Sequence, residues 1–169
     1  MKRNVLFIFS FVILTVLAVS CDLKTVMSPG VQFSSLLYRT SSVTDSTGQV
    51  VLVNDTITLS DSLNVGDTVR LPMILNGYYD YITSFAVSTD TSKVHLSLMW
   101  GDEYNGYLTT AADPEHGILA FKPDAVYAFL TTLVYVPQVS GTYRIDMELN
   151  SAAQAPYSQW TGHFFIGVK

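Results

Sequence analysis

The chain has 169 residues, of which 9 are basic and 14 acidic, and it contains a single cysteine. Because affinity for a phosphate backbone comes largely from lysine and arginine, the formal net charge of −5 argues against a nucleic-acid-binding protein and against electrostatic docking on an anionic membrane. A lone cysteine forms no internal disulfide, so the fold has to depend on a hydrophobic core, which a chain of this length is able to bury.

The first 20 residues have the layout of a secretory signal. Lys2 and Arg3 precede residues 5–19, a run that is apolar except for one serine and one threonine. This run is shorter than the roughly 20 apolar residues of a transmembrane helix, so we expect a targeting segment. Its removal takes away two basic residues and no acidic residue, which changes the formal charge from −5 to −7.

Residues 17–20, Leu-Ala-Val-Ser, directly precede Cys21 and together with it resemble the lipobox of bacterial lipoproteins. The resemblance implies cleavage before Cys21 and lipidation of that cysteine, and two or more acyl chains anchor a protein stably where a single chain is marginal. An ordinary secretory signal followed by a free cysteine, or an uncleaved anchor, is the alternative. We therefore expect a signal peptide over residues 1–20, a lipidated tether over residues 21–30 and a single β-sandwich domain over residues 31–169.

The composition is typical of strands. The chain contains 17 threonines, 17 serines and 19 valines but only three glutamates and five lysines, which favours strands and disfavours helices. We expect a first strand over residues 31–39 and a loop over residues 40–48. Two further strands, over residues 49–53 and 56–60, are expected to form a hairpin through a tight turn at the Asn-Asp pair of residues 54–55.

Alternation of apolar and polar residues becomes clear from residue 66 onward. Strands are predicted over residues 66–76, 81–89 and 93–100, because apolar residues recur at every second position. Their expected interior residues are Val69, Leu71, Met73, Leu75, Phe85, Val87, Val94, Leu96, Leu98 and Trp100. Pro72 has no N–H to donate to a neighbouring strand, so we expect its strand to be an edge or to carry a bulge.

The C-terminal half continues the pattern. We expect an irregular segment over residues 101–117, a short strand over 117–122, a central strand or a helical turn running into one over 125–136, and strands over 141–150 and 162–168. The strand over 141–150 alternates most clearly, and its inward residues are Tyr143, Ile145, Met147 and Leu149. Seven or more strands without a convincing amphipathic helix predict an all-β fold, an antiparallel β-sandwich.

Two short motifs resemble bacterial immunoglobulin-like domains. Residues 136–145 contain the Gly-Thr-Tyr pattern that is common at the start of the penultimate strand of those domains, and residues 65–69 resemble the start of their second strand. The resemblance covers residues 65–169 and implies an immunoglobulin-like β-sandwich. It also implies that the hydroxyl of Tyr143 ties its strand to a loop, as in a tyrosine corner. The cysteine pair and mid-strand tryptophan of antibody domains are absent from the sequence.

Residues that would carry catalysis or hold a metal are sparse. The Gly-x-Ser-x-Gly elbow of serine hydrolases is absent. His95, His116 and His163 fall on separate segments without the i, i+4 spacing of a zinc site, so we expect no metal and no cofactor. Four acidic residues share the irregular segment, which leaves a hydrolase and a calcium site as less favoured alternatives. They are Asp102, Glu103, Asp113 and Glu115.

Aromatic residues beside acidic ones indicate a ligand site. A flat ring covers the C–H groups of a sugar while neighbouring polar groups bind its hydroxyls. The candidate ligand-binding residues are Trp100, Asp102, Glu103, Tyr104, Tyr107 and Trp160. The alternative is that these rings cap the ends of the sandwich core. The sequence leaves open whether the segment over residues 101–117 binds sugar or calcium.

Four triplets between residues 45 and 69 consist of aspartate, then serine or threonine, then an apolar residue or threonine. They resemble the sequon that Bacteroidota use for O-glycosylation of exported proteins, which implies modification at Ser46, Thr56, Ser62 and Thr68. The alternative is that aspartate before serine or threonine serves turns.

We therefore expect a cell-envelope lipoprotein of a Bacteroidota-like organism that displays a non-catalytic β-sandwich for binding or scaffolding. Its lipid is the expected membrane contact, in the outer membrane rather than the inner, and its expected partner is a glycan or an envelope protein. The alternative is a glycan-binding accessory lipoprotein of a polysaccharide-capture system. A hydrolase and a fimbrial subunit are less favoured, and a fimbrial subunit would need an unpaired or exchangeable terminal strand.

Overall fold

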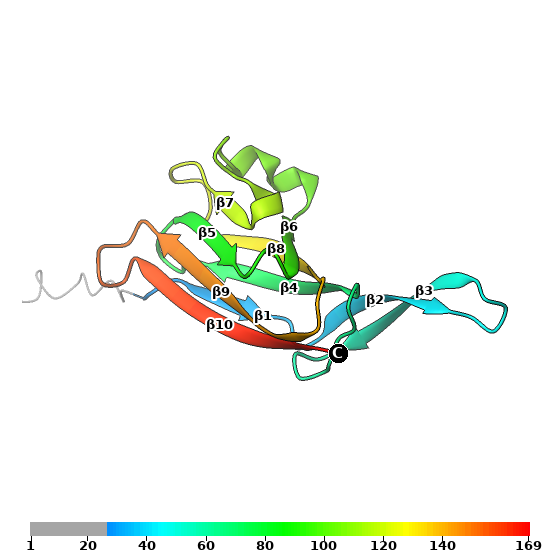
Figure 1. The fold of residues 1–169 in the computed structure, drawn as a ribbon. Coiled ribbons are helices and arrows are strands. Elements are labelled where there is room, and N and C mark those ends of the chain that lie inside the picture. The colour runs from blue at the N-terminus through cyan, green and yellow to red at the C-terminus, as the bar shows by residue number, and fades with distance from the viewer. Residues whose placement is uncertain (1–26) are drawn as a thin grey trace, which may run out of the picture.

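A computed structural model describes residues 27–169. The expected signal peptide, the expected lipidation site Cys21 and most of the expected tether lie outside the described residues. Residues 27–169 form two antiparallel sheets that pack face to face, so the predicted all-β, immunoglobulin-like sandwich is confirmed (Figure 1). Within this range no helix is long and apolar enough to cross a membrane.

The sandwich consists of a six-stranded sheet A and a four-stranded sheet B. The strands of sheet A are β1 (Gly30–Phe33), β2 (Leu37–Thr44), β3 (Val50–Ile57), β4 (Thr68–Asn76), β6 (Val94–Met99) and β8 (Ala128–Pro137). Those of sheet B are β5 (Ile82–Ser88), β7 (Ile118–Ala120), β9 (Gly141–Ser151) and β10 (Gln159–Val168). The order is β3-β2-β4-β8-β6 in sheet A, where β1 also pairs with β4, and β10-β9-β5-β7 in sheet B.

Strands β1 and β2 lie along the same edge of β4. β1 pairs with residues 73–76 of β4, and β2 pairs with residues 68–70. Between these segments lies Pro72, whose carbonyl accepts a hydrogen bond from the N–H of Ser34 at 3.0 Å. Pro72 has no N–H to return, which accounts for the interruption of the neighbouring strand. The expectation of an edge strand or a bulge at Pro72 is therefore wrong, because β4 is an interior strand and the break falls in its neighbour.

Strand β2 runs past the beginning of β4 and forms a hairpin with β3. Its last residue paired with β4 is Thr40, opposite Thr68, whereas its pairing with β3 continues to Thr44. Residues 41–53 therefore form a two-stranded ribbon, here named the β2–β3 arm, which projects beyond the body of the sandwich (Figure 1). Gly48 in the turn of the arm has φ +84°, a conformation that favours glycine.

The turn predicted at Asn54 and Asp55 is wrong, because both residues lie inside β3. Their side chains are held by β2: the Thr40 hydroxyl donates to Asn54 Oδ1 at 2.7 Å, and Arg39 Nε donates to Asp55 Oδ1 at 2.9 Å. The hydrogen bond from Arg39 lowers the pKa of Asp55. The loop expected over residues 40–48 is also wrong in its first half, which belongs to β2.

The alternation in the sequence correctly predicts the core. The interior residues expected in β4, β5, β6 and β9 are buried, whereas Trp100, which follows β6, is half-buried. Phe129 of β8 has three aromatic neighbours, and the two nearest ring centroids lie 4.9 Å away for Phe121 and 5.2 Å away for Tyr104. β8 is a strand over its whole length, so of the two interpretations of residues 125–136 the central strand is confirmed from residue 128 onward.

The segment between β6 and β7 is irregular as expected and contains two short 3₁₀ helices, η1 (Asp102–Tyr107) and η2 (Pro114–His116). Gly117 ends η2 with φ +75°, and a Cβ atom there would lie 2.6 Å from the carbonyl oxygen of Val87. The absence of a Cβ atom permits this close approach, and the N–H of Val87 in β5 donates to the carbonyl of Gly117 at 2.8 Å. β10 starts at Gln159, before the predicted start at residue 162, because its pairing with β9 already begins opposite Asn150.

Tyr143 connects the beginning of β9 to the loop that follows β8. Its hydroxyl lies 2.9 Å from the carbonyl oxygen of Val139 and 2.7 Å from that of Ser140, and its ring is buried. The tie between strand and loop that the resemblance to a tyrosine corner implied is therefore confirmed. Gly141, with φ +142°, makes room for it, because a Cβ atom at Gly141 would lie 2.9 Å from the Tyr143 hydroxyl.

Replacing Tyr143 by phenylalanine should lower the free energy of unfolding by about 1 kcal/mol, because the ring stays buried while the carbonyl groups lose their donor. Urea denaturation followed by tryptophan fluorescence measures this change. Tyr79→Phe is the matched control, since the Tyr79 side chain is 67% exposed, and it should leave the unfolding midpoint unchanged. Equal midpoints for Tyr143→Phe and the parent chain would contradict the prediction.

Candidate binding sites

Three of the six candidate ligand residues line one hollow on the outer face of sheet A. Trp100, Glu103 and Tyr104 surround it together with Arg70 of β4, and its volume is about 280 Å³. The rest of its lining comes from the end of β6 and from β8, namely Met99, Gly101, Leu130, Thr131 and Thr132. An aromatic ring, a cation and a carboxylate around one hollow suit a polar ligand that has an apolar face. We name it the η1 hollow.

The two rings of the η1 hollow also pack on the core. The indole Nε1 of Trp100 donates to Asn105 Oδ1 at 2.7 Å, and the Trp100 ring lies 6.4 Å from that of Phe129. The Tyr104 ring meets the same phenylalanine edge-on at 5.2 Å. Both side chains are half-buried, so they cap the end of the core and at the same time present part of their surface to the hollow.

The other candidate ligand residues lie outside the η1 hollow. Asp102 and Tyr107 belong to η1 and are exposed, and the ring centroid of Tyr107 lies 6.3 Å from that of Tyr104. Trp160 belongs to β10 of sheet B, where its ring covers Gly162: a Cβ atom at that glycine would lie 2.5 Å from the indole. β10 and η1 lie at opposite edges of the sandwich, so the structure does not bring Trp160 to the other aromatic residues (Figure 1).

The remaining acidic residues of the irregular segment lie in and beside η2. The Asp113 carboxylate lies 2.8 Å from His116 Nδ1 across η2, and Glu115 is exposed. In the part of the chain that the structure describes, no three side chains of the types His, Cys, Asp and Glu gather closely enough to hold a metal ion.

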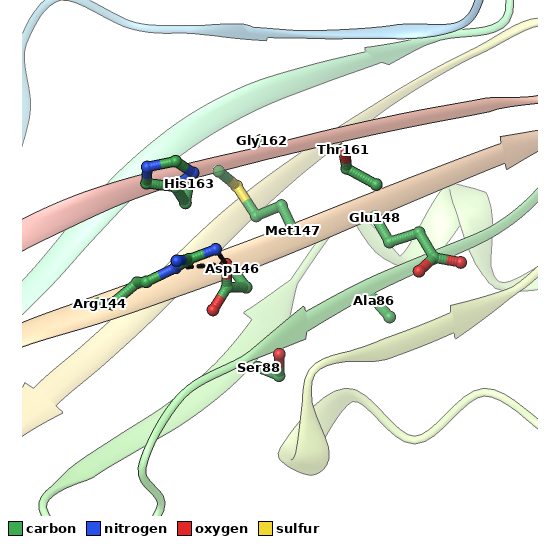
Figure 2. A pocket seen from close by; sticks show the side chains of 9 residues that line it. All are labelled: Ala86, Ser88, Arg144, Asp146, Met147, Glu148, Thr161, Gly162 and His163. Carbon is green, nitrogen blue, oxygen red and sulfur yellow. Dashed lines mark hydrogen bonds and ion pairs between the residues drawn. The ribbon is translucent and has the colours of Figure 1, made fainter.

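A second hollow, which sequence reasoning missed, lies on the outer face of sheet B (Figure 2). Its volume is about 350 Å³, and it crosses strands β5, β9 and β10. Arg144 Nε donates to Asp146 Oδ1 at 2.7 Å, and a hydrogen bond from Asn150 lowers the pKa of Glu148. The small side chain of Ala86 leaves room beside these longer ones. The alternation of β9 did place its charged residues outward, but the neighbouring small residue on β5 is not visible from that strand alone.

A third hollow lies between β5, β6, β8 and η2 and has a volume of about 640 Å³. It brings together His95 of β6 and His116 of η2, two histidines that the sequence places on separate segments. The buried residues Val87, Val94 and Leu96 form its apolar wall. Most of its polar lining residues are exposed, among them His95, Glu115 and His116, which fits an opening at the side of the sandwich more closely than a site with converging buried polar groups.

The β2–β3 arm carries the largest run of exposed apolar side chains in the described chain. Val50 and Leu52 are 71% and 70% exposed, and Val51 and Val53 between them are also exposed. Successive residues of a strand point to opposite faces, so both faces of the arm are apolar. Strand β3 pairs only with β2 among residues 27–169, which leaves its outer edge open.

The four candidate O-glycosylation sites lie around the arm and its base. The hydroxyl-bearing residues Ser46, Thr56 and Ser62 are exposed and Thr68 is half-buried. Their preceding aspartates also serve the local structure. Asp45, Asp61 and Asp67 accept hydrogen bonds from backbone N–H groups in turns, and Asp55 pairs with Arg39. The contacts of Asp45, Asp61 and Asp67 agree with the alternative that these triplets supply turn residues, whereas Asp55 lies inside β3.

Comparisons with known proteins found no matching family model and no matching curated protein. Among solved structures, the crystal structure of the Salmonella SafD adhesin is similar to this chain with a TM-score of 0.43 and 9% sequence identity. The match covers 84% of this chain and 99% of that chain.

Proposed function

We propose that this protein is a cell-envelope lipoprotein, held in the outer membrane by acyl chains on Cys21, that displays its β-sandwich as a binding or scaffolding module and does not catalyse a reaction. The β2–β3 arm is the observation that carries the proposal. The arm extends beyond the sandwich and exposes Val50 and Leu52. The outer edge of its strand β3 pairs with no other strand among residues 27–169. A strand edge of this kind binds another strand through main-chain hydrogen bonds, while its side chains supply selectivity.

The position of the arm relative to the N-terminal end supports display. Gly30 lies opposite Asn76 at one end of β4, whereas Thr40 lies opposite Thr68 at the other end. The chain therefore runs along the full length of β4, about 3.3 Å per residue, before the arm begins. A lipid on Cys21 would thus hold the end of the sandwich that is remote from the arm, and the arm would point away from the membrane.

A second candidate function is glycan binding at the η1 hollow. The observation that favours it is the grouping of Trp100, Glu103 and Arg70 around one hollow. The ring offers an apolar face for a pyranose, and the two charged groups offer hydrogen-bond partners for its hydroxyls. In this form the protein would be an accessory lipoprotein of a polysaccharide-capture system.

Cys21→Ala should abolish lipidation. Cells that express the parent chain and are fed an alkyne analogue of palmitate should yield a labelled protein in the membrane fraction, because acyl chains on Cys21 anchor it there. The Cys21→Ala chain should carry no label. Ser28→Ala, a change in the same segment, serves as the control and should label like the parent chain. Undiminished label on the Cys21→Ala chain would refute the lipoprotein assignment.

A photo-cross-linking amino acid at position 52 should capture a protein partner in intact cells as one discrete adduct, because the proposed contact passes through the arm. The same probe at position 165 is the control, since Phe165 is 55% exposed but lies on β10. Adducts are detected by immunoblot. Equal capture at both positions, or capture at neither, would refute the arm as the binding element.

A glycan-array screen of the full chain distinguishes the second candidate. A bound glycan should lose about tenfold in affinity for the Glu103→Gln variant, because a hydrogen bond to a charged group contributes about that much. Glu115→Gln is the matched control, since Glu115 is also exposed but lies outside the η1 hollow. Binding that is equally strong in both variants, or absent from the array, would remove the η1 hollow as a glycan site.

A further inference from the structure

The direction of the backbone groups shows which residues of β3 are free to pair. In the turn of the arm, the N–H of Asp45 donates to the carbonyl of Gln49 at 2.8 Å. Hydrogen-bonded and non-hydrogen-bonded pairs alternate along an antiparallel ladder, so the pairs Val43–Val51 and Ser41–Val53 are hydrogen-bonded as well. The even-numbered residues 50, 52 and 54 therefore direct their N–H and C=O groups to the outer edge.

The sequence of the arm lacks the features that keep an open strand edge from pairing with another strand. Natural sheets protect open edges with lysine, proline or bulges. From residue 42 to residue 54 the only charged residue is Asp45, and it accepts hydrogen bonds from the N–H groups of Thr47 and Gln49 in the turn. The pairing of β2 with β3 is continuous from residue 37 to residue 57 without a register shift. The edge is thus straight, apolar and uncharged.

We propose that the partner of the arm is a second copy of this chain, bound by antiparallel pairing of β3 with β3 about a twofold axis at Leu52. This inference rests on the proposed function, since it names the partner of the same arm. Leu52 then faces Leu52 of the second copy, Val51 faces Val53, and Val50 faces Asn54. The outward backbone groups of residues 50, 52 and 54 pair with one another, as an antiparallel ladder requires.

Hydrogen bonding and apolar side chains together select this register over its neighbours. Because only even-numbered residues face outward, the nearest alternatives have their axis at Val51 or at Val53. An axis at Val51 places Asn54 opposite Gly48, which lies outside β3, so that only the two pairs of Val50 with Leu52 remain hydrogen-bonded within the strand. An axis at Val53 places Val51 opposite Asp55, whose carboxylate is already bound by Arg39. The axis at Leu52 combines three hydrogen-bonded pairs within β3 with apolar matches on both faces of the ribbon, and like charges do not meet across it.

The shape of the molecule accommodates such a dimer. The arm clears the body of the sandwich, so two antiparallel arms keep the two bodies at opposite ends (Figure 1). The product is a continuous four-stranded sheet in the order β2-β3-β3-β2. A two-stranded ribbon by itself is marginally stable in water, whereas three or more strands with apolar side chains are stable, so the pairing also stabilises the arm.

The oligomeric state of the full chain, extracted in detergent, tests the proposal. Analytical ultracentrifugation should show a dimer for the parent chain and a monomer for Leu52→Lys, because that change brings two like charges together across the axis. Phe165→Lys, at a side chain of comparable exposure on β10, should remain a dimer. Tryptophan fluorescence should be the same for all three chains. A monomeric parent chain, or a Leu52→Lys chain that stays dimeric, would overturn the proposal.

Cysteine cross-linking in the oxidising envelope tests the register independently. A hydrogen-bonded pair places its Cα atoms about 5.5 Å apart, which a disulfide spans. Leu52→Cys should form a disulfide dimer by itself, whereas Val51→Cys should require a second copy that carries Val53→Cys. The parent chain with Cys21 gives the baseline. An equal yield of disulfide dimer from Val51→Cys alone would overturn the register.

A photo-adduct at position 52 with a different protein, together with a monomeric chain, would overturn the self-pairing but leave the proposed function in place.

Discussion

Hydrogen bonding along β4 is the constraint on which the rest of the structure depends. One edge of β4 is fully used by β8, which pairs with residues 69–76. The other edge lacks a donor at Pro72, and a single long neighbour would have to leave a carbonyl unpaired there. The chain covers this edge with two short strands, β1 and β2, that separate at Pro72. Because β2 is separate from β1, it continues past the beginning of β4, where it pairs with β3 alone and forms the arm. The break at Pro72 is thus linked to the β2–β3 arm, which carries the longest run of exposed apolar side chains among residues 27–169.

The strands that the sequence predicts well are those with one buried face. In β4, β6 and β9, burial of every second side chain imposes a period of two that is visible in the sequence without any knowledge of the partners. β3 has no such face, because seven of its eight residues are exposed. Its apolar run and the polar pair Asn54 and Asp55 therefore looked like a strand followed by a turn. The contacts that keep this pair in the strand come from Arg39 and Thr40, which are remote in the sequence.

The sequence predicts the candidate site only where the residues of the site are close together in the chain. Trp100, Glu103 and Tyr104 are close in the sequence, and a short 3₁₀ helix after β6 is enough to place them around one hollow. Arg70 joins them only because sheet A orders its strands β4-β8-β6. Trp160, a candidate for the same site, belongs to the other sheet. Aromatic residues near loops thus divide between ligand contact and core packing according to sheet order, which local sequence does not contain.

The edges of the two sheets differ in how they are covered, and this difference bears on the role of the arm. β7 is only three residues long, and β10 ends beside Leu63 and contacts β1 through Phe33 and Phe164, whose ring centroids lie 6.4 Å apart. The outer edge of β3 lacks such cover in the described chain, although an exposed strand of valine and leucine is prone to aggregate. Pairing with an identical edge removes this hazard, because an isologous contact uses the same patch on both copies and closes at two. A heterologous contact would leave the same edge open on the next copy and would propagate.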